Sequence, residues 1–407
     1  MLSRRQSLFT LANVPISLSG FGAGGAVTPA VAGDSAVLGP GDFKFTGTYL
    51  NAAHMHPIPL STAVAMREHI ETRLDPISRP RQAKQRFAKL INAEAEEIAL
   101  IPSTSYGESF VVGALQLKGN RPGRIVTDIL HYDGSLYMYR ELEKRGLSLS
   151  ILPMAENGTI DMNRLEAAVD NKTTLVAISL VSWLNGFEHD LKTVCDIAHK
   201  KGAKVYVDAI QGAGAVPIDV RASNVDFLAT STFKWLMGDF GCGFLYVRQD
   251  LLQNLSRPEF GYHQYTDADY HFLPGDKPGT ALFDAKPNDS TAMGYFEVGS
   301  VGTAAEIAAA ASLGNLIATG VENIQRNRQP LMERLSARLS RRYRQLTPQN
   351  SKSPIISFSF PDADKMLVSR IKEANINFEL YDNRFRISPS VYNSMADVDR
   401  AIDLLMA

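Results

Sequence analysis

The sequence predicts an α/β protein in which a mainly parallel sheet carries helices on both faces and a smaller α+β unit follows. Three observations support this fold class. Between residues 98 and 247, short apolar runs alternate with amphipathic segments, a pattern typical of parallel sheets that are covered by helices. Residues 256–297 break the rhythm with a run rich in Pro, Gly, Asp, Tyr and His. Residues 321–407 then form a strand and helix pattern of their own.

Composition excludes several classes of protein. The chain has 407 residues, with 42 Lys and Arg against 43 Asp and Glu. This balance gives no indication of binding to nucleic acid or to an acidic membrane surface. The two cysteines, Cys195 and Cys242, are too few for a disulfide framework or an unaided zinc site, and we assign no metal. Beyond the N-terminus no run of about 18 apolar residues occurs, so we expect no membrane span in the mature protein.

The first 32 residues resemble a twin-arginine export signal. Arg4 and Arg5 lie in MLSRRQSLF, a Gly/Ala-rich apolar stretch follows, and Ala30-Val31-Ala32 offers a small-residue cleavage site. Ser7 stands where the signal prefers Phe, and Pro15 interrupts the apolar stretch. We expect residues 1–32 to direct the folded protein through the twin-arginine (Tat) machinery to the periplasm. The alternative is a disordered basic tail on a cytoplasmic protein.

The elements of the larger domain follow from hydrophobic periodicity. A short apolar segment at 48–53 precedes two helices, 60–74 and 81–93. A strand at 98–101 leads through PSTSYG into an apolar helix at 110–117. Further strands are expected at 124–128, 147–152, 174–180, 205–207 and 243–247, with intervening helices at 135–145, 162–169 and 191–200.

The rest of the chain is expected to hold a long loop and a smaller domain. Residues 256–297 lack clear periodicity, and so long a loop usually covers an active site or contacts a second subunit. We expect the large domain to span residues 45–320, with 45–75 partly in the small domain, and the small domain to span 321–407. The expected elements after the loop are helices 304–318, 321–346, 363–374 and 396–406 and strands 354–360, 377–380 and 385–388.

Polar residues follow several of the predicted strands. Asp208 ends the apolar run Val205–Val207, and Lys234 follows before the Gly-rich segment 238–243. An acid at a strand end and a partly buried lysine are what pyridoxal 5′-phosphate (PLP) requires, one for its pyridine nitrogen and one for its aldehyde. The hydroxyl-rich turn PSTSYG, before a helix, predicts an anion site. Because the carboxyl ends of parallel strands share one edge, we expect this edge to collect His131, Trp183, Asn185, Asp208 and Gln211.

Eight motifs carry a resemblance to a known family. They are YLNAAHMHPIP, PSTSYGE, TDILHYDG, VSWLNGFEHDL, YVDAIQGAGAVPIDV, STFKWLMGDFGCGFLYV, FEVGSVGTA and RFRISPSVYN. From about Tyr49 to Leu405 the chain resembles the class V aminotransferases of the fold-type I PLP enzymes. This family includes cysteine desulfurases, kynureninase and isopenicillin N epimerase-like proteins. The resemblance implies a large domain with a mainly parallel seven-stranded sheet, and a homodimer with shared active sites.

The resemblance also implies roles for individual residues. Lys234 would hold PLP and move the substrate Cα proton, Asp208 would pair with the pyridine nitrogen, and Arg386 would clamp the substrate α-carboxylate. His131 would stack on the ring and Gln211 would lie near its phenolic oxygen. The remaining positions are Ser105, Tyr106 and Ser231 at the phosphate, Ser300 from the partner subunit, and Asn51, Trp183 and Asn185 on the substrate side.

Departures from the family pattern narrow the reaction. No cysteine follows Cys242, and Phe233 and Trp183 replace the His and Asn that cysteine desulfurases carry. Transamination, epimerisation and elimination remain. With the leader, the chain resembles periplasmic enzymes of pyoverdine siderophore maturation, which implies transamination or oxidative tailoring of a glutamate side chain. The alternatives are a carbon–sulfur lyase or epimerase acting on a small amino acid, and a non-catalytic PLP-fold protein, against which the joint presence of Lys234, Asp208 and Arg386 argues.

Overall fold

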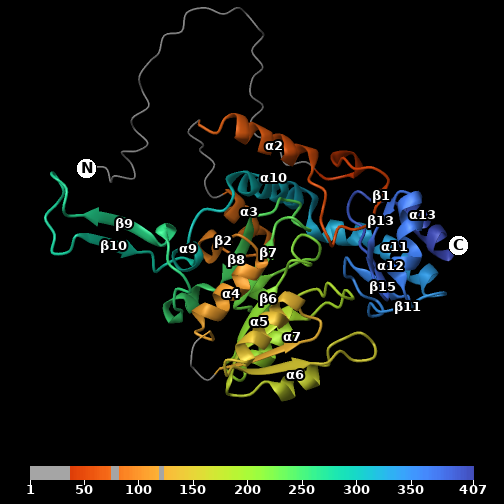
Figure 1. Cartoon of the computed structure of the whole chain (residues 1–407), viewed down its shortest axis with the longest axis horizontal. Coiled ribbons are helices and arrows are strands. Elements are labelled where there is room, and N and C mark those ends of the chain that lie inside the picture. The colour runs from red at the N-terminus through yellow and green to blue at the C-terminus, as the bar shows by residue number, and fades with distance from the viewer. Residues whose placement is uncertain (1–36, 75–81, 119–122) are drawn as a thin grey trace, which may run out of the picture. The chain divides into compact units, whose positions relative to one another are not determined.

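The computed structural model describes residues 37–74, 82–118 and 123–407 (Figure 1). The export signal expected at residues 1–32 lies outside these ranges. Among the described helices, none is by itself long and apolar enough to cross a membrane, although the pair at 303–319 and 321–339, bent by 74°, satisfies the length and composition criteria together.

A seven-stranded sheet forms the centre of the molecule, which confirms the predicted α/β class. The strand order is β2-β8-β7-β6-β5-β3-β4, and β8 runs antiparallel to both of its neighbours, whereas the other pairs are parallel. The strands are β2 (Ile98–Ile101), β3 (Arg124–Asp128), β4 (Ser148–Leu152), β5 (Thr173–Ser179), β6 (Lys204–Asp208), β7 (Phe227–Ser231) and β8 (Gly243–Val247). Strand β7 was missing from the sequence-based elements, although the apolar run Phe227-Leu228-Ala229 could have indicated it.

Helices cover both faces of this sheet, so its strands are apolar on both sides. On β6, Val205 and Val207 face one hydrophobic core while Tyr206 faces the other. This two-sided burial explains the continuous apolar runs in the sequence. The first core includes residues of α3 (Gln82–Ile91), α6 (Met162–Ala168), α7 (Leu191–His199) and α10 (Thr303–Thr319). The second includes residues of α4 (Thr104–Ala114), α5 (Asp133–Glu143) and α9 (Ala292–Phe296).

The C-terminal residues form a second sheet with its own core. The sheet is antiparallel in the order β11-β12-β15-β14, and helices α11, α12 and α13 pack with it. Leu50 joins this core, because β1 (Thr48–Tyr49) pairs in parallel with β13 (Ile376–Asn377). The domain boundary at residues 320 and 321 stays a prediction. The other elements are β11 (Arg344–Gln345), β12 (Ile356–Ser359), β14 (Glu379–Tyr381), β15 (Arg384–Ile387), α11 (Val321–Leu339), α12 (Ala363–Glu373) and α13 (Met395–Met406).

Residues 256–297 differ from the expected structureless loop. They contain an antiparallel hairpin of β9 (Tyr265–Tyr270) and β10 (Phe283–Pro287), which extends away from the central sheet in Figure 1. Every residue of β10 is exposed. The hairpin therefore has no buried face, and its sequence lacks the alternation of apolar and polar residues by which strands are recognised.

Helices α4 and α11 differ most from their predicted bounds. Helix α4 begins at Thr104 rather than at residue 110, because Ser103 already adopts the extended conformation of an N-cap residue. The hydroxyl-rich turn thus belongs to the first turn of the helix. Helix α11 ends at Leu339, and the chain enters β11 at Arg344 instead of continuing as a helix to residue 346.

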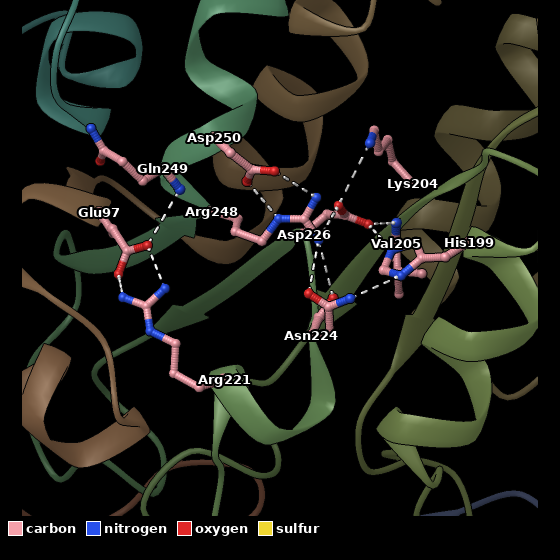
Figure 2. A network of polar contacts seen from close by, with 10 residues as sticks. All are labelled: Glu97, His199, Lys204, Val205, Arg221, Asn224, Asp226, Arg248, Gln249 and Asp250. Atoms are coloured by element: carbon pink, nitrogen blue, oxygen red, sulfur yellow. Dashed lines mark hydrogen bonds and ion pairs between the residues drawn. The ribbon is translucent and has the colours of Figure 1, made fainter.

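A polar network ties together the amino-terminal edge of the parallel strands (Figure 2). Asp226 is fully buried just before β7 and accepts hydrogen bonds from the Val205 amide at 2.8 Å and from His199 Nε2 at 2.7 Å. Arg248 Nη1 lies 3.1 Å from its other carboxylate oxygen. This carboxylate therefore joins β6, β7, α7 and the end of β8, and it leaves the opposite edge of the sheet for the chemistry.

Candidate active site

A cavity of about 190 Å³ lies at the carboxyl ends of β5, β6 and β7. Parallel α/β sheets place their ligand sites at this edge, because the connections there are loops that can carry polar side chains. The cavity is lined by Ser103, Thr104, Ser105, Glu108, Tyr132, Ser179, Val181, Trp183, Asp208, Ile210, Gln211, Ser231, Phe233 and Lys234.

Lys234 lies in the turn after β7, where Met237 N donates to its carbonyl oxygen at 2.8 Å. Burial lowers the pKa of its amine to about 8, the Asp208 carboxylate opposes this shift, and the nearby Arg386 adds to it. A lysine with a pKa near 8 is partly neutral at physiological pH, which is the form that attacks an aldehyde. Lys234 is thus suited to forming a covalent bond to a carbonyl ligand.

Asp208 is the last residue of β6 and is almost fully buried. The Ile210 amide donates to its Oδ1 at 2.9 Å, which fixes the carboxyl group. Burial raises the pKa of Asp208 to about 6, while His131 and Lys234 oppose the shift. At neutral pH this carboxylate is still negative and has no bonded cation among the described residues, so it can pair with a protonated pyridine nitrogen.

Hydroxyl groups surround the N-terminus of α4 at the other end of the cavity. The Thr104 amide and hydroxyl both lie 2.9 Å from Ser231 Oγ. A Cβ atom on Gly107 would come within 2.7 Å of Ile101 Cδ1 and 2.8 Å of Ala229 Cβ. Glycine therefore lets the first turn of α4 lie directly against the sheet. Hydroxyl groups and a helix N-terminus form a site that fits a phosphate group.

His131 lies behind the cavity wall rather than on it. Its ring is fully buried, with Nδ1 2.9 Å from Ser179 Oγ and Nε2 3.0 Å from Glu108 Oε1. Glu108 also accepts from the hydroxyl groups of Ser135 and Tyr139. The next residue in the chain, Tyr132, lines the cavity instead. The structure thus differs from the expectation that His131 faces a bound ring, because the turn after β3 directs His131 inward and Tyr132 outward.

The predicted substrate-side residues separate in space. Trp183 lines the cavity, but Asn185 does not, because its amide is bonded to the backbone at Gly158 O (2.8 Å) and Phe187 N (3.0 Å). Gln211 also lines the cavity, where its side chain connects Ala53 O (2.9 Å) with the Trp235 indole (2.8 Å). Asn185 is therefore a loop-fixing residue in this structure.

Arg386 belongs to a cluster that includes an unpredicted carboxylate. Arg386 is buried on β15, and its Nη1 donates to the Trp183 carbonyl at 2.9 Å. Glu379 Oε2 lies 3.6 Å from Arg386 Nη2, accepts from Asn51 Nδ2 at 3.1 Å and lies 3.2 Å from His54 Nδ1. Glu379 faces Arg386 because β14 and β15 pair in that register. In the sequence, the two-residue turn Asp382-Asn383 between two predicted strands could have indicated this pairing.

Two predicted phosphate residues lie outside the cavity lining. Tyr106 is 54% exposed and packs against Phe110, while Ser103 and Thr104 line the cavity in its place. Ser300 is exposed and contacts the side chains of Tyr262 and His263. A contribution of Ser300 to a partner's site stays a prediction. Within the described ranges, no group of three or more His, Cys, Asp or Glu side chains could hold a metal ion.

The residues present fit PLP in three separate ways. A buried lysine of lowered pKa, a buried strand-end carboxylate and a hydroxyl-lined helix N-terminus meet in one cavity with apolar and aromatic walls. These are the groups needed by the aldehyde, the ring nitrogen and the phosphate of the cofactor. The fold and this constellation define a fold-type I PLP-dependent enzyme.

The family follows from comparison with known sequences. A family model described as aminotransferase class-V matches residues 60–400, so the chain belongs to this family. A probable cysteine desulfurase of Methanothermobacter thermautotrophicus is 30% identical over 305 residues, which are 72% of this chain and 72% of the relative. The uncharacterized aminotransferase YcbU of Bacillus subtilis is 26% identical over 330 residues, 80% of this chain and 82% of the relative.

Solved structures share the fold. The cysteine desulfurase CsdA of Escherichia coli superposes with a TM-score of 0.78 at 21% identity, covering 90% of this chain and 96% of that chain. The cystine C–S lyase C-DES superposes with a TM-score of 0.76 at 19% identity, covering 88% and 97%. At these identities the similarity concerns the fold alone.

Proposed function

We propose that this chain is a PLP-dependent carbon–sulfur lyase that acts on a small amino acid with free α-amino and α-carboxylate groups. The observation that carries the proposal is that Lys234 and Asp208 line one cavity with Arg386 close by. This combination provides an amine, a carboxylate for the cofactor and a guanidinium for the substrate carboxylate. The relative named as a probable cysteine desulfurase, which is 30% identical over 72% of this chain, supports cleavage at sulfur.

The chemistry assigns one task to each residue. PLP, when bound, supplies an electron sink for the electrons released at Cα. The neutral amine of Lys234 would take the Cα proton, and Arg386 would orient the carboxylate so that this proton faces the amine. The Cβ–S bond would then break, the sulfur would leave as a thiolate and take up a proton, and addition of one water to the remaining fragment would yield pyruvate and ammonia.

The cysteines of this chain argue against a desulfurase mechanism that passes sulfur to the enzyme. Cys195 and Cys242 are the only cysteines in the sequence, and both are fully buried. Burial raises the pKa of Cys195 to about 12 and raises that of Cys242 as well. Neither forms the reactive thiolate that would accept sulfur, so the sulfur would leave as a free thiol.

Product analysis tests this proposal. The purified enzyme, loaded with PLP, is mixed with S-substituted cysteines, and the released thiol and pyruvate are measured. Lysis should release the two products in equal amounts. Lys234→Ala should abolish both while the protein remains folded by circular dichroism. Exchange of the Cα proton for deuterium without release of thiol would overturn lysis and indicate transamination or epimerisation.

A second proposal concerns an exported role. Arg4, Arg5 and the small-residue site at Ala30-Val31-Ala32 support export of the folded protein through the Tat machinery to the periplasm. As the alternative to carbon–sulfur cleavage, the enzyme would there tailor the glutamate of a pyoverdine-type siderophore, which keeps free α-amino and α-carboxylate groups for Lys234 and Arg386. Fractionation of cells that express Arg4→Lys/Arg5→Lys tests export, because the double variant should remain in the cytoplasm. Incubation with a glutamyl siderophore precursor, followed by mass spectrometry, tests the tailoring.

We also propose a homodimer in which Ser300 completes the partner's phosphate site. Ser300 is exposed and does not line the cavity of its own subunit, which is compatible with a role across an interface. Ser300→Ala should weaken PLP retention during gel filtration, with the dimer intact by light scattering. If the wild-type protein is a monomer in light scattering, or if Ser300→Ala retains PLP as tightly as the wild type, this arrangement is wrong.

A further inference from the structure

A second guanidinium, that of Arg384, lies next to Trp183, which lines the cavity. Arg384 and Arg386 are two residues apart on β15, so their side chains leave the strand on the same face. Arg384 Cζ lies 4.0 Å from the centre of the Tyr381 ring and 5.6 Å from that of Trp183. Arg386 Cζ lies 5.9 Å from the same Tyr381 ring. The two positive charges therefore flank Tyr381, next to Trp183, which lines the cavity.

The two arginines differ in their negative partners. Arg386 faces the Glu379 carboxylate at 3.6 Å, whereas Arg384 forms no ion pair with a carboxylate in residues 37–74, 82–118 and 123–407. Burial lowers the pKa of Arg386, and the nearby Arg384 lowers it further. Like charges at close range in a partly buried place disfavour each other, so an added anion between or beside them is favoured.

Buried hydrogen-bond donors without partners gather at the same place. They are Nε of Arg384, Nε of Arg386 and Nε1 of Trp183, each shielded from solvent and without a hydrogen-bond acceptor. A buried polar group without a partner is costly, and such groups in a pocket indicate the ligand atoms that satisfy them. Three donors and one unpaired positive charge require more than one acceptor atom. A ligand that satisfies all of them is an anion.

We propose that Arg384 and Trp183 form a second anion subsite beside Arg386, so that the preferred substrate is an amino acid whose side chain ends in a carboxylate. This inference rests on the proposed function, since it assumes that Arg386 holds the α-carboxylate. Arg384 then binds the distal carboxylate, and the Trp183 indole donates a further hydrogen bond to it. For a carbon–sulfur lyase, the substrate class is cysteine with a carboxylate-bearing substituent on sulfur.

A matched pair of substrates tests the subsite. S-carboxymethyl-L-cysteine and its amide, S-carbamoylmethyl-L-cysteine, differ in charge but hardly in shape. We expect kcat/KM to be about 10- to 100-fold higher for the carboxylate, the range expected of a charge-assisted hydrogen bond. Arg384→Gln should reduce this preference to about twofold, and Arg384→Lys should restore part of it. Arg344→Gln, which alters an exposed arginine on β11 of the same sheet, should leave the preference intact.

Binding of amino acids that contain no sulfur keeps this test separate from lysis. L-glutamate and L-glutamine form a second matched pair, whose dissociation constants for the PLP-loaded enzyme are measured by calorimetry. A preference for glutamate that is lost in Arg384→Gln and weakened in Trp183→Phe supports the subsite even if no thiol is released, in which case only the lyase proposal fails. Equal binding of the two ligands by the wild-type enzyme, or an unchanged preference in folded Arg384→Gln, would overturn the subsite.

Discussion

Arg386 Nη1 donates a hydrogen bond of 2.9 Å to the carbonyl oxygen of Trp183. This bond joins β15 of the C-terminal sheet to the loop after β5 of the central sheet. The Arg386 side chain belongs to the C-terminal sheet, but a loop of the central sheet therefore fixes the orientation of its guanidinium. A bidentate donor held in this way is suited to a carboxylate in a fixed position.

The first prediction follows from this bond. Arg386→Lys keeps the charge but cannot bond the Trp183 carbonyl and a carboxylate with the same geometry. We expect at least about a tenfold increase in the dissociation constant for amino acids, with PLP still bound. Titration of the cofactor absorbance with an amino acid measures the constant, and Arg344→Lys serves as the control. Unchanged affinity would exclude Arg386 as the carboxylate clamp.

A second prediction concerns the pH dependence of PLP binding. Burial lowers the pKa of Lys234 to about 8, and only the neutral amine attacks the aldehyde. The rate at which the cofactor-free protein binds PLP covalently should therefore rise with pH and level off above about 8. Because the Asp208 carboxylate favours the protonated amine, Asp208→Asn should shift this midpoint to lower pH. Stopped-flow absorbance measures both, and Asp226→Asn, at the opposite edge of the sheet, should leave the midpoint unchanged.

Asp208 supports a third prediction, on stability. Burial raises its pKa from 3.8 to about 6 in the folded cofactor-free protein, so folding favours the protonated acid. Its contribution is fully present below the unfolded-state pKa of 3.8 and is lost as pH rises through about 6. At pH 8 the buried charge costs about 3 kcal/mol.

Removal of that charge should therefore stabilise the protein. Asp208→Asn keeps an oxygen for the Ile210 amide, and its free energy of unfolding at pH 8 should exceed that of the wild type by up to about 3 kcal/mol. The difference should shrink as pH falls from 6 towards 4. Urea unfolding of both proteins without cofactor, across this range, provides the measurement. A variant that is less stable at pH 8 would contradict the expected sign.

Gly107 supports a fourth prediction. A Cβ atom at this position would contact Ile101 and Ala229 at 2.7 and 2.8 Å, so Gly107→Ala must push the first turn of α4 away from the sheet. The Thr104 amide would then move from Ser231, and we expect the affinity for PLP and for inorganic phosphate to fall by at least about tenfold. Equilibrium dialysis measures PLP affinity. Gly41→Ala is the matched control, because a Cβ atom there meets no atom within 4 Å.

Glu108 supports a fifth prediction, because its carboxylate holds the wall behind the cofactor site. It accepts from His131, Ser135 and Tyr139 and is itself buried. Its charge and hydrogen bond help to raise the pKa of His131 against the effect of burial, which lowers it. Glu108→Gln should lower the His131 pKa, observable by NMR titration, whereas Glu108→Ala should destabilise the protein by about 3–5 kcal/mol in urea unfolding. An unchanged His131 pKa in Glu108→Gln would refute this coupling.

Much of the central fold could be predicted because its strands are buried on both faces. Runs such as Val205–Val207 and Gly243–Val247 are continuous and apolar, and their ends carry the polar residues that line the cavity. The hydroxyl-rich segment PSTSYG was correctly predicted to lie at the carboxyl edge of the sheet. The first helical turn of α4, which it contains, was nevertheless assigned to a loop. Serine and threonine favour both helix N-termini and turns, so the sequence did not separate the two.

The sequence by itself determined the class of fold, the lysine and the acid, because a strand-end carboxylate and a buried amine are local features of Asp208 and Lys234. Only the tertiary structure decided which neighbours reach the cavity. Strand pairing placed Glu379 opposite Arg386. In the turn after β3, Tyr132 lines the cavity and His131 does not. Asn185 was turned towards backbone carbonyls. Side-chain direction in loops depends on contacts between residues far apart in the chain, which a local pattern does not contain.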